Sequence, residues 1–470
     1  MAKRLKTNYE SRLDAAAETI VNNDHCPIPG LVIMARRGED VYQKAFGYAD
    51  KEAGRLMTND AQFRCFSMTK VLTTSIALML RDQGLLELEA PVETYLPAFG
   101  RQFEVLHEAP HGEPGAFKVP YTSFMTGKTQ NLSFTKTAAQ NKILVKHCLS
   151  ESTGIGYDMW TDFDLVYNQS LFGHQYGVAQ ALRRQKGLGF YSSNSIIGQN
   201  ATLEEYCDAI AEAGYLTDEP GTFSYGLGAL LMGRIIEVVC ERVLGKHERF
   251  SRICEKKLFE PLGMSSAAFY LNDGDPRIAK IPQLYAATAN EGSGPSGAID
   301  VKPYVKCLPM VDDFPNTVTT AHFEGPRSCD SGDTGSCMTV LDYSKFYEML
   351  LAGGCTPNGR RILKEQSVRD LAYGQFSDLD RQSKIARAFG LTGEAASFNY
   401  GWAVEAKTDK SPHCNHWSGY ANNHGRLYIE EDSYILLFPQ FMASTPASFP
   451  LGEPVIKEPM IAAFLSEWEY

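Results

Sequence analysis

The sequence predicts an α/β protein of the α+β type, in which strands from both chain ends form one antiparallel sheet and the middle of the chain is mostly helical. Near the N-terminus, apolar residues at 31–37 and 41–48 flank the turn Gly38-Glu39-Asp40, a pattern typical of a β-hairpin. Strand patterns return in the last third of the chain, at residues 400–406, 425–429 and 433–438. Because helical segments separate these two groups, we expect one sheet built from both termini and flanked by helices.

Helical spacing of apolar residues accounts for much of the remaining chain. A helix over 68–81 begins directly after Ser67 and ends at Gln83-Gly84, where glycine is a suitable C-terminal cap. Further helices are expected at residues 9–21, 203–213, 227–244, 250–259 and 458–468.

We therefore expect two domains with the active site between them. Residues 1–62 and 325–470 form the α/β sheet domain, and residues 63–324 form the mostly helical domain. Within the latter, residues 100–141 are polar and aromatic without a clear period, so we expect a long loop insertion. Its aromatic residues are expected to line one wall of an apolar pocket: Phe103, Phe117, Tyr121, Phe124 and Phe134.

Composition limits the classes of function. The chain has 470 residues, 44% of them hydrophobic, and a net charge of −11 without a long basic run, which disfavours binding to nucleic acid or an anionic membrane. No HExxH motif or recognised spacing of histidine ligands is present, so neither a metal nor another cofactor is expected. The basic N-terminus lacks a following apolar segment, and no stretch reaches the ~18 apolar residues of a membrane span. With eleven cysteines and no CxxC pair, these features predict a cytoplasmic protein that binds small molecules.

Two Ser-x-x-Lys motifs occur, and one of them lies in a context suited to catalysis. Ser67 follows an extended segment and opens an apolar-faced helix, so its hydroxyl and the amine of Lys70 lie one turn apart on the same face. Lys70 can take the serine proton if burial lowers its pKa, and the positive end of the helix dipole favours the alkoxide. The other motif, Ser133 to Lys136, lies in the aperiodic 100–141 segment. The competing interpretation of Ser67 is a helix N-cap followed by a solvated lysine.

Around this motif the chain resembles the class C β-lactamase family, a group of serine β-lactamases and penicillin-binding proteins that includes DD-peptidases, family VIII carboxylesterases and lovastatin-type acyltransferases. Segments similar to the family follow one another in the same order, at residues 66–70, 83–97, 145–155, 220–225, 261–264, 332–336 and 342–343. The resemblance implies the β-lactamase/transpeptidase-like fold. It also implies catalysis through an acyl-enzyme on Ser67.

In this family a tyrosine of a Tyr-x-Asn element shares the proton transfer with the lysine, and by position this residue is Tyr225. The chain departs from the family because Leu227 stands in place of the Asn. Two literal Tyr-x-Asn matches begin at Tyr270 and Tyr420, but both lie in the wrong order relative to the flanking segments. The resemblance therefore implies Tyr225 as a catalytic residue, and the alternative is a buried aromatic side chain at a helix start.

The third family element is Lys-Thr-Gly, and the best match is Trp417-Ser418-Gly419. The lysine of β-lactam enzymes helps to hold the substrate carboxylate, so its replacement by tryptophan favours neutral acyl esters as substrates. A Trp-x-Gly form of this element resembles that of family VIII carboxylesterases. A shift of one residue would place His416 in this role. A core aromatic on a strand is the structural alternative for Trp417.

The resemblance also implies an oxyanion hole made by the backbone N–H groups of Ser67 and Tyr420.

The leading interpretation of the sequence is a carboxylesterase or acyltransferase, in which Ser67 attacks an ester or thioester and water or an acceptor alcohol releases the acyl group. A β-lactamase, or a peptidase or amidase acting on D-amino-acid amides, is the second interpretation, and Trp417 weakens it. The third is a non-catalytic binding protein. A Gly-x-Ser-x-Gly nucleophile elbow does not occur in the sequence.

Overall fold

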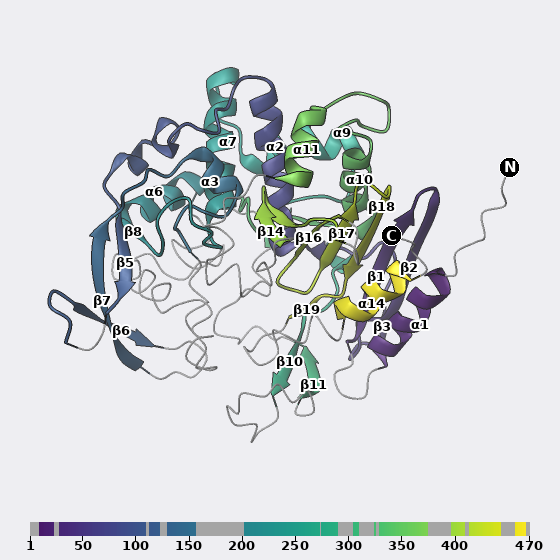
Figure 1. Ribbon diagram of the computed structural model, residues 1–470. Coiled ribbons are helices and arrows are strands. Elements are labelled where there is room, and N and C mark those ends of the chain that lie inside the picture. The colour runs from purple at the N-terminus through teal and green to yellow at the C-terminus, as the bar shows by residue number, and fades with distance from the viewer. Residues whose placement is uncertain are drawn as a thin grey trace.

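The computed structural model, drawn in Figure 1, describes residues 9–22, 28–109, 112–122, 129–156, 202–272, 274–289, 304–309, 324–325, 329–374, 396–408, 413–442 and 456–466. In Figure 1 a large sheet separates helices α1 and α14 on one side from helices such as α2 and α7 on the other. Within these segments, no helix combines the length and the apolar character needed to cross a membrane.

The central sheet joins the two ends of the chain. Its strands lie in the order β14-β15-β16-β17-β18-β1-β2-β3, and neighbouring strands are antiparallel. β1 pairs with β18, from Val32 opposite Phe438 to Arg37 opposite Ser433. This confirms the prediction of an antiparallel sheet built from both chain ends. The strands are β1 (Gly30–Arg37), β2 (Asp40–Asp50), β3 (Arg55–Leu56), β14 (Ala396–Asn399), β15 (Trp402–Glu405), β16 (Cys414–Ser418), β17 (His424–Tyr428) and β18 (Ser433–Phe438).

The sheet is covered on both faces, which explains why its central strands are almost continuously apolar. In β1, Val32 belongs to the larger hydrophobic core and Ile33 to a second core on the opposite face. This alternation follows from the two-residue period of a strand. Helices α1 (Tyr9–Val21) and α14 (Glu458–Leu465) close the second core.

Helix α2 (Thr69–Asp82) runs through the larger core. All of its residues from Thr69 to Leu80 are buried, which is typical of a helix with neighbours on every side. Its polar side chains find partners within the core, because Thr69 Oγ1 lies 2.7 Å from Ser336 Oγ and Thr73 donates to the carbonyl of Gly332.

The other helices agree closely with the sequence patterns. The predicted helix 203–213 is α6, and the predicted helix 227–244 begins one residue later as α7. The segment 250–259 is helical but changes from α-helix to a π-helical turn, η5 (Glu255–Phe259). The α-helices are α3 (Val145–Leu149), α6 (Leu203–Ala213), α7 (Gly228–Leu244), α8 (Phe250–Cys254), α9 (Glu260–Leu262), α10 (Val340–Leu351) and α11 (Glu365–Tyr373), and the 3-10 turns are η1 (Phe66–Met68), η2 (Val92–Thr94), η3 (Pro97–Gly100) and η6 (Ile278–Lys280).

The expectation of a loop over 100–141 is wrong, because much of this segment forms strands. β5 (Glu104–Glu108), β6 (Phe117–Thr122) and β7 (Thr129–Ala138) join β8 (Tyr215–Leu216) in a sheet with the order β6-β7-β5-β8. This sheet has a small apolar core centred on Leu106 and Phe134. Because only a few apolar side chains of these strands face inwards, the sequence shows no clear two-residue period of apolar residues. Phe134 therefore packs inside this sheet, and Phe103 packs in the larger core.

Several short strands complete the described structure. β4 pairs with β13 directly before the segment that holds Ser67, and β10 lies between β11 and β19. The bounds are β4 (Phe63–Arg64), β9 (Leu271–Asn272), β10 (Tyr285–Ala289), β11 (Tyr304–Pro309), β12 (Glu324–Gly325), β13 (Cys337–Met338) and β19 (Phe441–Met442).

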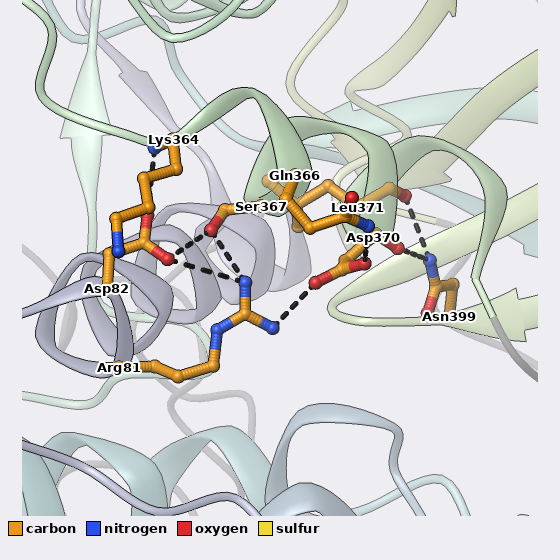
Figure 2. A network of polar contacts seen from close by, with 8 residues as sticks. All are labelled: Arg81, Asp82, Lys364, Gln366, Ser367, Asp370, Leu371 and Asn399. Atoms are coloured by element: carbon orange, nitrogen blue, oxygen red, sulfur yellow. Dashed lines mark hydrogen bonds and ion pairs between the residues drawn. The ribbon is translucent and has the colours of Figure 1, made fainter. Parts of the chain in front are cut away.

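A polar network anchors the C-terminal end of α2 to α11 (Figure 2). Asp82 accepts hydrogen bonds from the N–H of Lys364 at 2.8 Å and from Ser367 Oγ at 2.6 Å, so it caps the first turn of α11. Arg81 donates to Ser367 Oγ and to Asp370 Oδ2, both at 2.6 Å. These bonds link two helices that are almost 300 residues apart in the sequence, and they hold helix α2, which follows Ser67.

We predict that Asp82→Ala lowers the free energy of unfolding by about 1–3 kcal/mol, because the N–H of Lys364 and the hydroxyl of Ser367 lose their acceptor. Chemical denaturation measures the change. The matched control is Asp60→Ala, which removes an exposed ion pair with Lys280 and should change stability by no more than about 0.5 kcal/mol. If Asp82→Ala and Asp60→Ala lowered the free energy of unfolding equally, the role of Asp82 as an anchor would be contradicted.

Candidate active site

Ser67 lies at a sharp turn between strand β4 and helix α2. The N–H of Cys65 donates to the carbonyl of Ser336 at 2.9 Å and fixes the chain just before this turn. Phe66 has a φ of 46°, a left-handed conformation that is strained for a bulky residue and recurs at functional sites. Ser67 follows in η1 and is 9% exposed, so it lies at the margin of the core.

Lys70 is fully buried one helical turn after Ser67. Its Nζ lies 3.4 Å from Ser67 Oγ and 3.4 Å from the carbonyl oxygen of Asp333. The same nitrogen lies 4.7 Å from the centre of the Tyr225 ring. The structure thus brings together the serine, the lysine and the tyrosine that were singled out in the sequence.

Two glycines after Tyr225 allow the chain there to pack closely against α3 and the segment that follows it. This packing brings Tyr225 into the cluster. A Cβ atom on Gly226 would lie 2.0 Å from the carbonyl oxygen of Ile155, and one on Gly228 would lie 2.7 Å from that of Cys148. Larger residues at these two positions would push the start of α7 outwards. The close approach of two backbones therefore positions the tyrosine.

Trp417 contributes a fourth side chain from strand β16. Its Nε1 donates to the hydroxyl of Tyr225 at 3.2 Å, and the two ring centroids are 5.3 Å apart. Phe398 of β14 packs at 4.8 Å from the Trp417 ring and at 5.1 Å from Phe223. Trp417, and not its neighbour His416, is therefore the residue of the third element that contacts Tyr225.

The acidic neighbours of Lys70 decide its protonation. Burial acts to lower the pKa of Lys70, but Tyr225, Glu151 and Asp333 together outweigh it and raise the pKa above its usual value. The condition drawn from the sequence, a Lys70 pKa lowered towards neutral, is therefore not met in the resting site. The sequence motif shows the spacing of the amine and the hydroxyl, but it does not show which acidic groups the fold places around the amine.

Tyr225 is held in its neutral form. Burial is the largest cause that raises its pKa, and Lys70 opposes this effect while Glu151 adds to it. Hydrogen bonds with Ser67 and Trp417 also act to lower the pKa, without reversing the net rise. At rest the pair therefore consists of an ammonium and a phenol, and it must lose one proton before it can accept the proton of Ser67.

The backbone N–H groups of Ser67 and Tyr420 belong to two segments that pack closely together. Ser67 lies in the first turn of a helical segment, where N–H groups have no intrahelical partner. None of the turn and loop hydrogen bonds in the described backbone uses the N–H of Ser67 or of Tyr420. Gly419 permits the close packing of the two segments, since a Cβ there would lie 2.4 Å from the carbonyl oxygen of Cys65.

The side chains of His416 and Ser418 are engaged elsewhere. They alternate with Trp417 along β16 and so lie on the opposite face of the strand. His416 Nε2 is 2.8 Å from Glu405 Oε1, and Ser418 Oγ is 2.8 Å from His424 Nδ1. Both predicted binding residues therefore have partners outside the cluster of Ser67, Lys70 and Tyr225.

A family model described as Beta-lactamase matches residues 15–448. The chain belongs to the Beta-lactamase family. It is 25% identical to esterase EstB of Burkholderia gladioli over 283 residues, which are 60% of this chain and 55% of EstB, so the match spans little more than half of that relative.

Two solved structures have a similar fold. The unliganded simvastatin synthase LovD from Aspergillus terreus has a TM-score of 0.67 at 17% identity, covering 99% of this chain and 100% of that one. EstCE1, described as a hydrolase with promiscuous acyltransferase activity, has a TM-score of 0.61 at 19% identity, covering 97% and 98% of the two chains. At such identities these matches show the fold, and they confirm the predicted β-lactamase/transpeptidase-like fold.

In this Beta-lactamase family member, the second Ser-x-x-Lys motif and the Tyr-x-Asn match that begins at Tyr270 lie outside the cluster. Ser133 and Lys136 lie on β7, where residues three apart face opposite sides, and Lys136 pairs with Glu104 at 2.8 Å. Tyr270 packs under the guanidinium of Arg249 at 5.2 Å. A strand and a surface contact thus account for these residues.

Sequence reasoning missed two acidic residues of the site, Glu151 and Asp333. Both are buried, and both act on the pKa of Lys70. Glu151 lies in the segment 145–155 that resembles the family, and an acidic residue between two serines of that segment was the available signal. In the described part of the chain, no cluster of three or more His, Cys, Asp or Glu side chains could hold a metal ion.

We predict that Trp417→Phe slows the reaction of Ser67 with a fluorophosphonate probe about five- to tenfold, because a smaller aromatic ring remains while the N–H that bonds to Tyr225 is lost. Labelling rates at several pH values measure the effect. The control is Trp402→Phe, which removes the bond from another buried indole to the carbonyl of Leu371. That change should lower stability without slowing the labelling, and an unchanged rate for Trp417→Phe would refute the role of its N–H.

Proposed function

We propose that this Beta-lactamase family member is a carboxylesterase or acyltransferase that works through an acyl-enzyme on Ser67. The observation that carries the proposal is the contact of Lys70 Nζ with both Ser67 Oγ and the face of the Tyr225 ring. A serine needs a base within hydrogen-bond reach to attack a carbonyl, and these side chains supply a hydroxyl, an amine and a phenol in one cluster. The esterase and acyltransferase relatives support the same chemistry.

In the proposed acylation step, the pair of Lys70 and Tyr225 first loses one proton to solvent. Ser67 Oγ then bonds to the carbonyl carbon of an ester or thioester while its proton passes to this pair. Collapse of the tetrahedral intermediate breaks the bond to the leaving alcohol or thiol, which takes up that proton. Water or an acceptor alcohol repeats the sequence in reverse and releases the acyl group, so hydrolysis and transfer share every residue.

We assign the stabilisation of the developing oxyanion to the N–H groups of Ser67 and Tyr420. Their position on two segments that meet at Gly419 supports this assignment, because close packing of these segments lets both donors approach one atom. This contribution comes from the backbone and does not depend on the identity of the Tyr420 side chain.

The substrate class follows from the surroundings of Trp417. By the resemblance, Trp417 stands where the family's β-lactam enzymes carry a lysine. The ring of Phe398 packs against Trp417, and Phe223 packs against Phe398. Aromatic side chains cannot neutralise a substrate carboxylate, so we propose a neutral acyl ester or thioester as substrate. A β-lactamase or D-amino-acid amidase remains the second candidate, on the strength of the family itself.

The two-domain division is part of this proposal. Ser67, Lys70 and Tyr225 come from the proposed helical domain, 63–324, whereas Trp417 and Tyr420 come from the proposed sheet domain, 1–62 and 325–470. The hydrogen bond between Trp417 and Tyr225 joins the two sets of residues. An active site between the domains accounts for this origin of its parts.

We predict that the protein hydrolyses p-nitrophenyl butyrate faster than a chromogenic cephalosporin, and that Ser67→Ala lowers ester turnover at least about a thousandfold because the nucleophile is lost. Intact-mass analysis should show an added butyryl group in the wild type and none in the variant. Ser133→Ala removes the serine of the other Ser-x-x-Lys motif and should leave turnover unchanged.

Turnover by Ser67→Ala equal to that of the wild type would contradict the proposed nucleophile. Preference for the cephalosporin would favour the second candidate. A folded wild-type protein that forms no adduct with either substrate or with a fluorophosphonate would instead indicate a binding protein.

A further inference from the structure

Glu151 holds the backbone on both sides of Tyr225. Its carbonyl oxygen accepts a hydrogen bond from the N–H of Ser224 at 2.7 Å, and its carboxylate Oε2 accepts one from the N–H of Gly226 at 2.8 Å. The residue is 1% exposed, and its φ of 50° is unusual for a side chain of this size. A strained, buried acidic residue that brackets a catalytic tyrosine indicates a specific role.

The second carboxylate oxygen of Glu151 has no hydrogen-bond partner in the described part of the chain. This atom, Oε1, is buried, although a buried carboxylate oxygen normally accepts at least one bond. The groups that interact with this carboxylate come from several elements: the ammonium of Lys70 on α2, the phenol of Tyr225 before α7, the carboxylate of Asp333 before β13 and the thiol of Cys148 on α3. Glu151 therefore contributes a negative charge to the buried site beside Ser67.

We propose that Glu151 is a positioning residue of the acyl-transfer site, which holds Tyr225 from both sides, keeps Lys70 in its ammonium form and so sets the pH at which Ser67 becomes a nucleophile. This inference rests on the proposed function of Ser67, Lys70 and Tyr225. It assigns to Glu151 an effect that passes through these residues and no contact with the substrate.

The direction of the effect follows from the charges. Burial raises the pKa of Glu151 to about 7, and Asp333 also raises it, whereas Lys70 and the N–H of Gly226 act to lower it. Glu151 is therefore largely ionised above neutral pH.

An ionised Glu151 favours the protonated forms of its neighbours, and it raises the pKa of both Lys70 and Tyr225. Since the pair must lose a proton before it accepts that of Ser67, the negative charge delays activation to higher pH. Removing the charge should permit activation at lower pH.

The test compares Glu151→Gln with Glu151→Ala in the full-length protein. Glutamine keeps an oxygen that can accept from the N–H of Gly226 but carries no charge, whereas alanine removes both the acceptor and the charge. On the acidic side of the pH profile, the rate of Ser67 labelling by a fluorophosphonate and kcat/KM for p-nitrophenyl butyrate should both rise with pH; this rise is the acidic limb. We expect Glu151→Gln to move the acidic limb of both about one pH unit lower. Its melting temperature should stay close to that of the wild type. Glu151→Ala should melt earlier and label slowly at every pH.

The matched control is Glu237→Gln on α7. Glu237 is also buried, its pKa is also raised chiefly by burial, and its Oε1 accepts from the N–H of Phe250 at 2.8 Å, but its ion pair is with Arg234. This change should alter stability and leave the pH profile of labelling in place. A shift of the profile by Glu237→Gln as large as that by Glu151→Gln would overturn the inference.

If Glu151→Gln had the same acidic limb as the wild type, the inference would also be overturned. Glu151 would then be a purely structural residue. These outcomes are distinct from a failure of the proposed function. If the wild type forms no adduct at Ser67 at any pH, the acyl-enzyme proposal fails, whereas an active wild type with an unshifted variant refutes the role of Glu151 alone.

Discussion

The arrangement of the site depends on the burial of one ammonium group. Lys70 has no exposed surface and lies in a helix that is buried on all sides, where an uncompensated charge would be very unfavourable. Acidic groups from three separate segments surround it: Glu151 after α3, Tyr225 before α7 and Asp333 before β13. Because these segments are distant in the sequence, Lys70 can be buried only when the core around α2 has assembled. The same compensation keeps Lys70 protonated at rest, and in the mechanism that we propose Lys70 therefore shares the proton transfer with Tyr225.

The second requirement is that a strand from the C-terminal third reaches this helix. The pairing of β1 with β18 joins both chain ends in one sheet and places β16 beside the turn at Ser67. Gly419 and Gly226 then allow backbone contacts that a Cβ atom would prevent. Trp417 completes the connection through its bond to Tyr225, so the position of the phenol depends on the sheet as well as on α7.

Elements with a strong local pattern could be predicted from the sequence. The hairpin at the N-terminus, the helices α2, α6 and α7 and the strand β18 each combine a clear apolar period with recognisable ends, and the resemblance to the family ordered them correctly. The strands within 100–141 could not be predicted, because their sheet buries few apolar side chains and is made mostly of polar residues. Element type follows from sequence where burial is extensive, and it is obscured where a sheet lies near the surface.

For the site, the sequence by itself determined the spacing of Ser67 and Lys70 on one helix face and, through the order of the family segments, the choice of Tyr225 over the literal Tyr-x-Asn matches. Only the tertiary structure decided that Trp417 and not His416 contacts Tyr225, because the alternation of β16 in the folded sheet determines which side chain faces the tyrosine. It also decided the charge of Lys70. A pKa depends on the distances to all neighbouring charges and on burial, and Glu151 and Asp333 acquire those distances only when distant segments pack together.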